Sequence, residues 1–201
     1  MLVPRGAAWD AYAERLEALT DIGEQVALTQ TVFVAAPPEV TPLPGQAAFG
    51  CFAREPVNDA GEVKIHFYNR DTDDAGGPLA TPKRPTREAE LTALARHVRE
   101  VDPAALRLKG RSWLYNLEAY RRLFPPDYVA SRTAAAEPIH LSGTSSWGQL
   151  IDAREAIRPD VRDAFLANFA RLDPAAPWRI FPHPVLEVSA PMESFYRHFG
   201  V

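Results

Sequence analysis

Val63-Lys-Ile-His-Phe-Tyr68 and, further along the chain, Leu106-Arg-Leu108 are the two segments that decide the fold. Apolar and polar side chains alternate in the first, which predicts a half-buried strand, and the second predicts a shorter strand. Residues 87–100 between them predict a helix, because the apolar residues fall on one helical face: Leu91, Leu94, Ala95 and Val98. A strand–helix–strand unit of this length favours two parallel neighbouring strands.

The carboxyl ends of these two strands are the expected place for a ligand, as in other open α/β sheets. Asn69 and Arg70 follow the first strand, and Arg111 and Ser112 follow the second. Ser112 is a predicted N-cap for a helix that begins after it. Free backbone N–H groups at a helix start can receive an anion, so we expect ligand contacts around this turn.

Trp113 stands at the centre of that turn, and two interpretations of it remain open. On a helix that starts after Ser112, one face would carry an apolar stripe: Trp113, Leu117, Tyr120 and Phe124. Such a stripe is typical of packing, so we expect Trp113 in the core and the ligand contacts on its neighbours, including Tyr115. If the turn is instead the ligand cleft, Trp113 would be partly exposed with Arg111 or Asn116 beside it.

The segments before residue 63 predict an antiparallel meander. Residues 24–35 are rich in β-branched side chains and predict a strand, and residues 48–54 predict another. Residues 36–45 contain four prolines, which predict a loop. Asn58-Asp-Ala-Gly61 supplies turn residues just before the strand at Val63, so the meander leads into the strand–helix–strand unit.

The rest of the chain adds helices and further strands. Helices are predicted at residues 7–20, from Pro159 onward and at 192–199, and strands at 128–133 and 185–189. The helix after Pro159 is expected to bury one face: Val161, Ala164, Phe165, Phe169 and Leu172. No repeat or domain boundary stands out, so the sequence predicts a single mixed α/β domain over residues 1–201.

Composition and charge argue against several classes of protein. With 22 Lys and Arg against 26 Asp and Glu, the net charge is −4, whereas a nucleic-acid-binding domain would carry a basic face. The candidates for a local basic patch, which we interpret as solvated surface, are Arg107, Lys109, Arg111, Arg121 and Arg122. No apolar run approaches the ~18 residues that span a bilayer, and no signal-peptide core is evident. We therefore expect a cytoplasmic protein whose partner is a small-molecule ligand or another protein.

Single residues with reactive side chains give few further signals. Cys51 is the one cysteine, which excludes an internal disulfide, and its apolar surroundings predict a small buried side chain. His66 lies on the polar face of the first strand and is a candidate general base. No metal-ligand spacing occurs, so no metal site is expected. The nucleophile-elbow and P-loop patterns are absent as well.

The order of elements resembles the GNAT acyltransferase superfamily, and most closely the GNAT-like C-terminal domains of some bacterial acyltransferases. Those domains carry a similar strand, a Gly-Pro-Leu loop, a helix and a Ser-Trp-Leu turn. The matching pieces here are Lys64-Ile-His-Phe67, Gly77-Pro-Leu79 and Ser112-Trp-Leu114. The likeness spans residues 63–133, about a third of the chain. It implies a GNAT-like domain in which the meander forms the central antiparallel strands.

The resemblance also implies an activity, namely acyl transfer from a coenzyme A thioester to an amine. His66 or Glu118 would remove a proton from the amine, and Tyr115 or Tyr120 would protonate the departing thiolate. Acyl-coenzyme A would be the cofactor, held at the two strand ends by Asn69, Arg70, Gly76, Gly77, Arg111 and Ser112.

The expected cofactor loop departs from the pattern of that superfamily. Members usually carry an Arg or Gln and then Gly-x-Gly or Gly-x-Ala directly before the helix. Here Arg70 is separated from Gly76-Gly77, and three prolines follow before the helix. An alternative hypothesis is therefore a non-catalytic α/β binding or interaction module that has lost the cofactor loop. The two hypotheses differ in whether one open polar cleft gathers His66, Tyr68, Asn69, Arg70 and Trp113.

Overall fold

The computed structural model describes residues 7–35, 46–139, 141 and 144–201. The chain divides into two compact units, residues 1–41 and 42–201, and each is described by itself. The single domain over residues 1–201 therefore stays a prediction. The proline-rich loop predicted at residues 36–45 lies outside the described residues.

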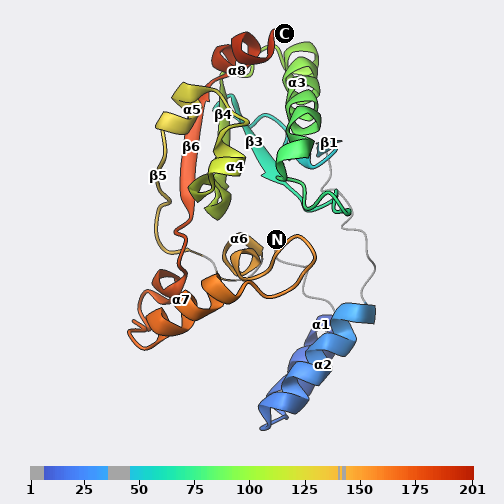
Figure 1. The fold of residues 1–201 in the computed structure, drawn as a ribbon, viewed down its shortest axis with the longest axis vertical. Helices are drawn as coiled ribbons and strands as arrows, with labels where there is room; N and C mark the ends of the chain where they lie inside the picture. Colours follow the sequence, from blue (N-terminus) through green and yellow to red (C-terminus); the bar gives the residue numbers. More distant parts are fainter. Residues whose placement is uncertain (1–6, 36–45, 140, 142–143) are drawn as a thin grey trace. The chain divides into compact units, whose positions relative to one another are not determined.

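The first unit consists of α1 (Ala7–Glu17) and α2 (Ile22–Ala35), drawn in blue in Figure 1. The strand predicted at residues 24–35 is wrong, because α2 covers that segment. Thr29 donates its hydroxyl hydrogen to the carbonyl oxygen of Gln25 at 2.8 Å, which satisfies the side chain within the helix. The hydroxyl groups of Thr29 and Tyr12 are also 2.9 Å apart. This contact with α1 illustrates how tertiary structure outweighs a weak β propensity.

The second unit is built on a mixed sheet of six strands in the order β1-β2-β3-β4-β6-β5. The strands are β1 (Ala47–Phe49), β2 (Phe52–Arg54), β3 (Glu62–Phe67), β4 (Arg107–Ser112), β5 (Thr133–Ala134) and β6 (Leu186–Pro191). β1, β2 and β3 form an antiparallel meander, and its first strand is β1 rather than the segment at residues 24–35. The α/β fold class is therefore confirmed.

A crossover helix joins the two parallel strands at the centre of the sheet. β3 pairs in parallel with β4, from Glu62 opposite Arg107 to Ile65 opposite Gly110. The helix between them is α3 (Arg84–Val101), preceded by the 3-10 turn Thr81–Lys83. The predicted strand–helix–strand unit is thus confirmed, and it places the residues after Phe67 and after Ser112 at the same edge of the sheet.

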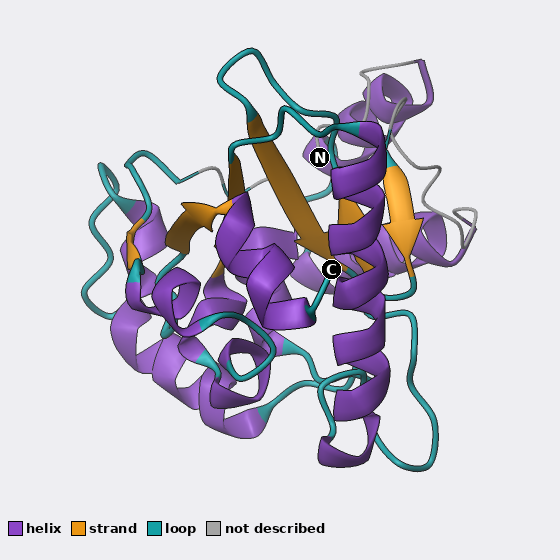
Figure 2. Ribbon diagram, turned by 90° about the horizontal axis from the view of Figure 1, so that it is seen from above, coloured by secondary structure: helices purple, strands orange, loops and turns teal. Residues whose placement is uncertain are grey.

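The two faces of the sheet differ in character. One face packs against α3 and the helices after β4, and its core includes Val63, Ile65 and Leu108. Alternate residues of β3 and β4 point to the opposite face, where Lys64, Lys109 and other charged side chains are exposed. Figure 2 shows the strands in orange and the helices in purple. The alternation seen in the sequence therefore separates an apolar core from a charged face.

The chain after β4 makes short helical pieces that pack on the core face. These are the 3-10 turn Trp113–Asn116, α4 (Glu118–Arg121) and α5 (Pro126–Ala130). Between β5 and β6 lie α6 (Thr144–Trp147), two more 3-10 turns at 148–150 and 177–180, and α7 (Pro159–Phe169). The chain then forms β6 and α8 (Met192–Phe199), as predicted from the sequence.

Several predicted boundaries need correction. The strand expected at residues 48–54 is a hairpin of β1 and β2, because Gly50 adopts a φ of 59° and turns the chain. The first half of the strand expected at residues 128–133 is the end of α5, which Pro126 starts at its first position, and only Thr133 lies in a strand. On α7 the predicted core face is largely wrong: Val161 is buried, whereas Phe169 is 51% exposed. Within the described residues, no helix is long and apolar enough to cross a membrane.

Candidate functional site

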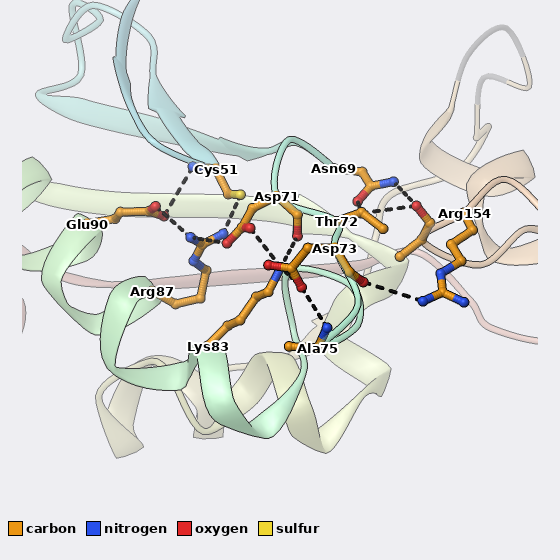
Figure 3. Close-up of polar contacts among 11 residues, drawn as sticks. Cys51, Asn69, Asp71, Thr72, Asp73, Ala75, Lys83, Arg87, Glu90 and Arg154 are labelled. Carbon is orange, nitrogen blue, oxygen red and sulfur yellow. Dashed lines mark hydrogen bonds and ion pairs between the residues drawn. The ribbon is translucent and has the colours of Figure 1, made fainter.

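The turn between β3 and α3, where the sequence predicts a cofactor loop, is filled by a cluster of charged side chains (Figure 3). We call it the α3 cluster, and its members are Cys51, Asp71, Asp73, Lys83, Arg87 and Glu90. Asp71 receives hydrogen bonds from Lys83 at 2.7 Å and from Arg87 at 2.9 Å. The bond from Lys83 is the largest influence that holds the pKa of Asp71 below its ordinary value. An internal carboxylate therefore already neutralises the cations at the start of α3.

Arg87 connects Asp71 to the β1–β2 turn. It is 2% exposed, and it donates to Glu90 at 2.8 Å and to the sulfur of Cys51. Glu90 in turn accepts the backbone N–H of Cys51 at 3.1 Å. Burial raises the pKa of both the Cys51 thiol and the Glu90 carboxyl group. The predicted buried position of Cys51 is confirmed, and its thiol is part of a packed polar contact.

A second segment, the loop at residues 151–157, closes the same turn from outside. The carbonyl oxygen of Ala153 accepts hydrogen bonds from Asn69 at 2.8 Å and from Thr72 at 3.1 Å. A Cβ atom on Gly77 would collide with the side chain of Ala153, so this glycine is needed for the close approach of the loop. Asn69 and Gly77, predicted to hold a cofactor, thus hold this loop, and Gly76 lies beside them.

The second strand end is also packed by internal contacts. β4 extends through Ser112, whose side chain caps the following turn by accepting the N–H of Leu114 at 3.1 Å. The continuous helix predicted after Ser112 is wrong, because Leu117 is extended and separates the 3-10 turn from α4. Trp113 is 8% exposed and stacks on His183 with ring centroids 5.9 Å apart. The core interpretation of Trp113 is therefore the correct one.

Two of the candidate catalytic residues, Tyr115 and Glu118, differ in burial. Tyr115 is 1% exposed, and its hydroxyl group is 2.8 Å from that of Tyr128. Tyr115 belongs to the hydrophobic core, and its burial raises the pKa of the phenol well above the ordinary value. Glu118 is exposed and pairs with Arg121 at 2.8 Å. Tyr115 and Glu118 therefore do not face a common space.

His66 is held by a carboxylate on the charged face of the sheet. Its Nε2 lies 2.6 Å from Oε1 of Glu55, and the Nζ of Lys64 is 3.4 Å from the same oxygen. Burial acts to raise the pKa of Glu55, but the bonds and charges of His66 and Lys64 outweigh it and lower that pKa. Arg70 lies over the ring of Tyr68, 4.5 Å from its centroid. Glu55 thus orients the imidazole of His66, as general-base catalysis by a histidine requires.

A groove of about 530 Å³ runs along the charged face of the sheet. We call it the sheet-face groove. Four cationic side chains line it, namely Lys64, Arg107, Lys109 and Arg111, and two carboxylates, Glu62 and Glu187. Hydroxyl groups of Ser131, Thr133 and Ser189 border it as well. Of the predicted site residues, Arg111 lines this groove, whereas Trp113 and Asn69 do not.

The groove contains three residues of the basic patch that the sequence indicates, namely Arg107, Lys109 and Arg111. Arg107, Lys109 and Arg111 alternate along β4, and Lys64 lies in the alternating pattern of β3. What the sequence could not show is that the parallel register places Lys64 directly opposite Lys109. The groove is thus a product of strand pairing rather than of any local motif.

A smaller cavity of about 260 Å³ lies between the start of β6 and the residues after β5. Glu137 and Arg179 line it and form an ion pair at 2.8 Å. His183 also lines it, and burial, followed by the charge of Arg158, lowers the pKa of that imidazole. Glu137 and Arg179 therefore neutralise each other at this cavity.

Known proteins offer no assignment for these sites. Within the described residues, no group of three His, Cys, Asp or Glu side chains could hold a metal ion. No model of a protein family, no curated protein and no solved structure matches this chain.

Proposed function

We propose that this chain is a non-catalytic binding module with a GNAT-like sheet, and that its small-molecule ligand binds in the sheet-face groove. The order of the meander, α3 and β4 agrees with the order that the resemblance implies, which supports the GNAT-like sheet. The closed turn before α3 is the observation that carries the proposal. Where coenzyme A would need an open anion site, Asp71 pairs with Lys83 and Arg87, and Ala153 packs on Gly77.

The groove is the better candidate for a ligand on grounds of size and access. Its volume of about 530 Å³ lies within the range of small-molecule sites. The side chains of Lys64 and Lys109 are 46% and 48% exposed, so both ammonium groups can reach a ligand. By contrast, Lys83 and Arg87 have side chains that are 8% and 3% exposed.

Titration of the isotope-labelled protein with acetyl-coenzyme A, and then with longer acyl chains, tests the closed turn. The backbone amide signals of Gly76, Gly77 and Arg87 should not move at millimolar ligand. Any signals that do move should belong to β4 and β6, which line the groove. Saturable movement of the Gly76 and Gly77 signals would overturn the proposal, because it would place the cofactor at the turn.

One observation favours acyl transfer as a second candidate. Glu55 holds His66 at 2.6 Å, the arrangement of a general base and the carboxylate that orients it. In this case His66 would remove the proton from an amine on the charged face of the sheet. Tyr115 would have no part in the reaction, since its hydroxyl group is buried against Tyr128.

Release of free thiol from acetyl-coenzyme A in the presence of a panel of amines measures this activity. If acyl transfer occurs, His66→Gln should abolish it, and His198→Gln, which changes an exposed histidine on α8, should leave it intact. Transfer that depends on His66 would establish the enzyme in place of the binding module. We expect no amine-dependent release from the unaltered chain.

A further inference from the structure

We propose that the ligand of the sheet-face groove is a small phosphorylated molecule whose dianionic group lies between Lys64 and Lys109. This inference rests on the proposed function and names the class of ligand. The central juxtaposition is the pairing of these two lysines at the same register position of β3 and β4. Both side chains belong to the exposed face of the sheet and both line the groove.

Like charges directly opposite each other on neighbouring strands destabilise a sheet. In this pair the repulsion is only partly relieved: Glu62 binds Lys109 at 2.8 Å, whereas Glu55 is 3.4 Å from Lys64. A local arrangement that opposes folding in this way is typical of a functional site. A bound dianion would relieve the repulsion, because one group would neutralise both ammonium ions.

The remaining lining of the groove fits a phosphate group. Arg107 and Arg111 flank Lys109 on the same face of β4, and guanidinium and ammonium groups are the usual phosphate partners in proteins. The guanidinium of Arg107 donates to the hydroxyl oxygen of Ser189 at 3.0 Å, which fixes it at the wall of the groove. Arg111 donates to the carbonyl oxygen of Ala136 at 3.2 Å.

The two carboxylates of the groove limit what can bind. Glu187 lies 3.5 Å from Arg111 and faces the groove from β6. A single phosphate group between the two lysines would compete with Glu62 for Lys109 and with Glu55 for Lys64. A long polyanion that followed the whole groove would meet Glu187 as well. The charge pattern therefore favours a compact phosphate ester over an extended nucleic acid.

Amide-signal titrations of the whole chain with pyrophosphate and glycerol 3-phosphate, at constant ionic strength, test the inference. We expect saturable movement of the Lys64, Lys109 and Ser189 signals. Lys109→Gln and Lys64→Gln should each weaken binding by about tenfold, the effect of one charge-assisted hydrogen bond. Arg96→Gln removes an exposed positive charge on α3 outside the groove and should leave the affinity unchanged.

Thermal unfolding of the same variants separates loss of binding from loss of fold. Each substitution removes the repulsion between Lys64 and Lys109 together with one exposed ion pair, to Glu55 or to Glu62. Because exposed ion pairs contribute little, the unfolding midpoint without ligand should stay within about 3 °C of the unaltered protein. Absence of movement in β3, β4 and β6, or equal weakening by Arg96→Gln, would overturn the inference. So would tighter binding of succinate or of a short single-stranded oligonucleotide. These results test the ligand of the groove. The proposed function is tested separately, because movement of the Gly76 and Gly77 signals would overturn it.

Discussion

Gly110 lies in β4 with the hydroxyl groups of Tyr115 and Tyr128 packed over its Cα atom. A methyl group at this position would collide with both phenols. We expect Gly110→Ala to lower the free energy of unfolding by about 1–3 kcal/mol, the usual effect of overpacking a core. Urea unfolding followed by circular dichroism measures the change. Tyr115→Phe removes the nearer hydroxyl group, so the double variant should recover part of the loss, and strictly additive losses would contradict this account.

The ionised carboxylate of Asp71 stabilises the folded state, because the bond from Lys83 and the charge of Arg87 lower its pKa. This contribution is present above the unfolded-state pKa, about 3.9, and is lost as the pH falls through the lower folded-state pKa. Asp71→Asn should therefore be less stable at about pH 7 and lose less stability on acidification. Urea midpoints measured down to about pH 3 show both effects. Asp163→Asn, which changes an exposed partner of Arg162, should follow the unaltered protein throughout.

Among the elements, those with a clear periodic pattern could be predicted from the sequence, and those set by distant contacts could not. The helix expected at residues 87–100 and the strand at Val63 exist because each buries one regular apolar face. The segment at residues 24–35 contains β-branched residues, yet the helix α2 forms there beside α1. Just before the break at Leu117, the side chain of Asn116 donates to the carbonyl oxygen of Pro184 at 2.8 Å. No local pattern reveals a partner so far along the chain.

The loop at residues 151–157 is an element whose position depends on one close contact. Gly77→Ala would force its new methyl group against Ala153. We expect the loop to be displaced, and the bonds from Asn69 and Thr72 to the carbonyl oxygen of Ala153 to break. Hydrogen exchange read by mass spectrometry should then be faster at residues 69–77 and 151–157, while β4 stays protected. Ala153→Gly in the same chain should restore the slow exchange, and unchanged exchange in Gly77→Ala alone would refute the contact.

On the scale of the whole molecule, the main hydrophobic core among the described residues lies in the second unit. Its buried members run from Phe52 to Phe195. We therefore expect the fragment 42–201 to unfold cooperatively by calorimetry, with a midpoint within about 3 °C of the full chain. A fragment without a cooperative transition would show that residues 1–41 complete the core.

The place of the candidate site could be predicted only in part, since its residues meet through the sheet. The sequence correctly predicted that the ends of β3 and β4 lie at the same edge of the sheet, because a strand–helix–strand unit imposes that geometry. It could not show that Asp71 and Ala153 fill this edge, because their partners lie in α3 and in the loop after β3. Nor could it show the groove, which exists because Lys64 and Lys109 share a register position.

Cys51 supplies a built-in reporter for the α3 cluster. As the single thiol in the chain it is 1% exposed, in contact with Arg87, and its raised pKa leaves little thiolate. A thiol reagent can therefore modify it only in molecules in which the β1–β2 turn has separated from α3. Labelling of the native protein should be slow and should reach the rate of a free peptide thiol in urea. Arg87→Gln should accelerate it far more than Arg96→Gln does. The labelling rate of one sulfur atom thus measures how often the β1–β2 turn separates from the α3 cluster.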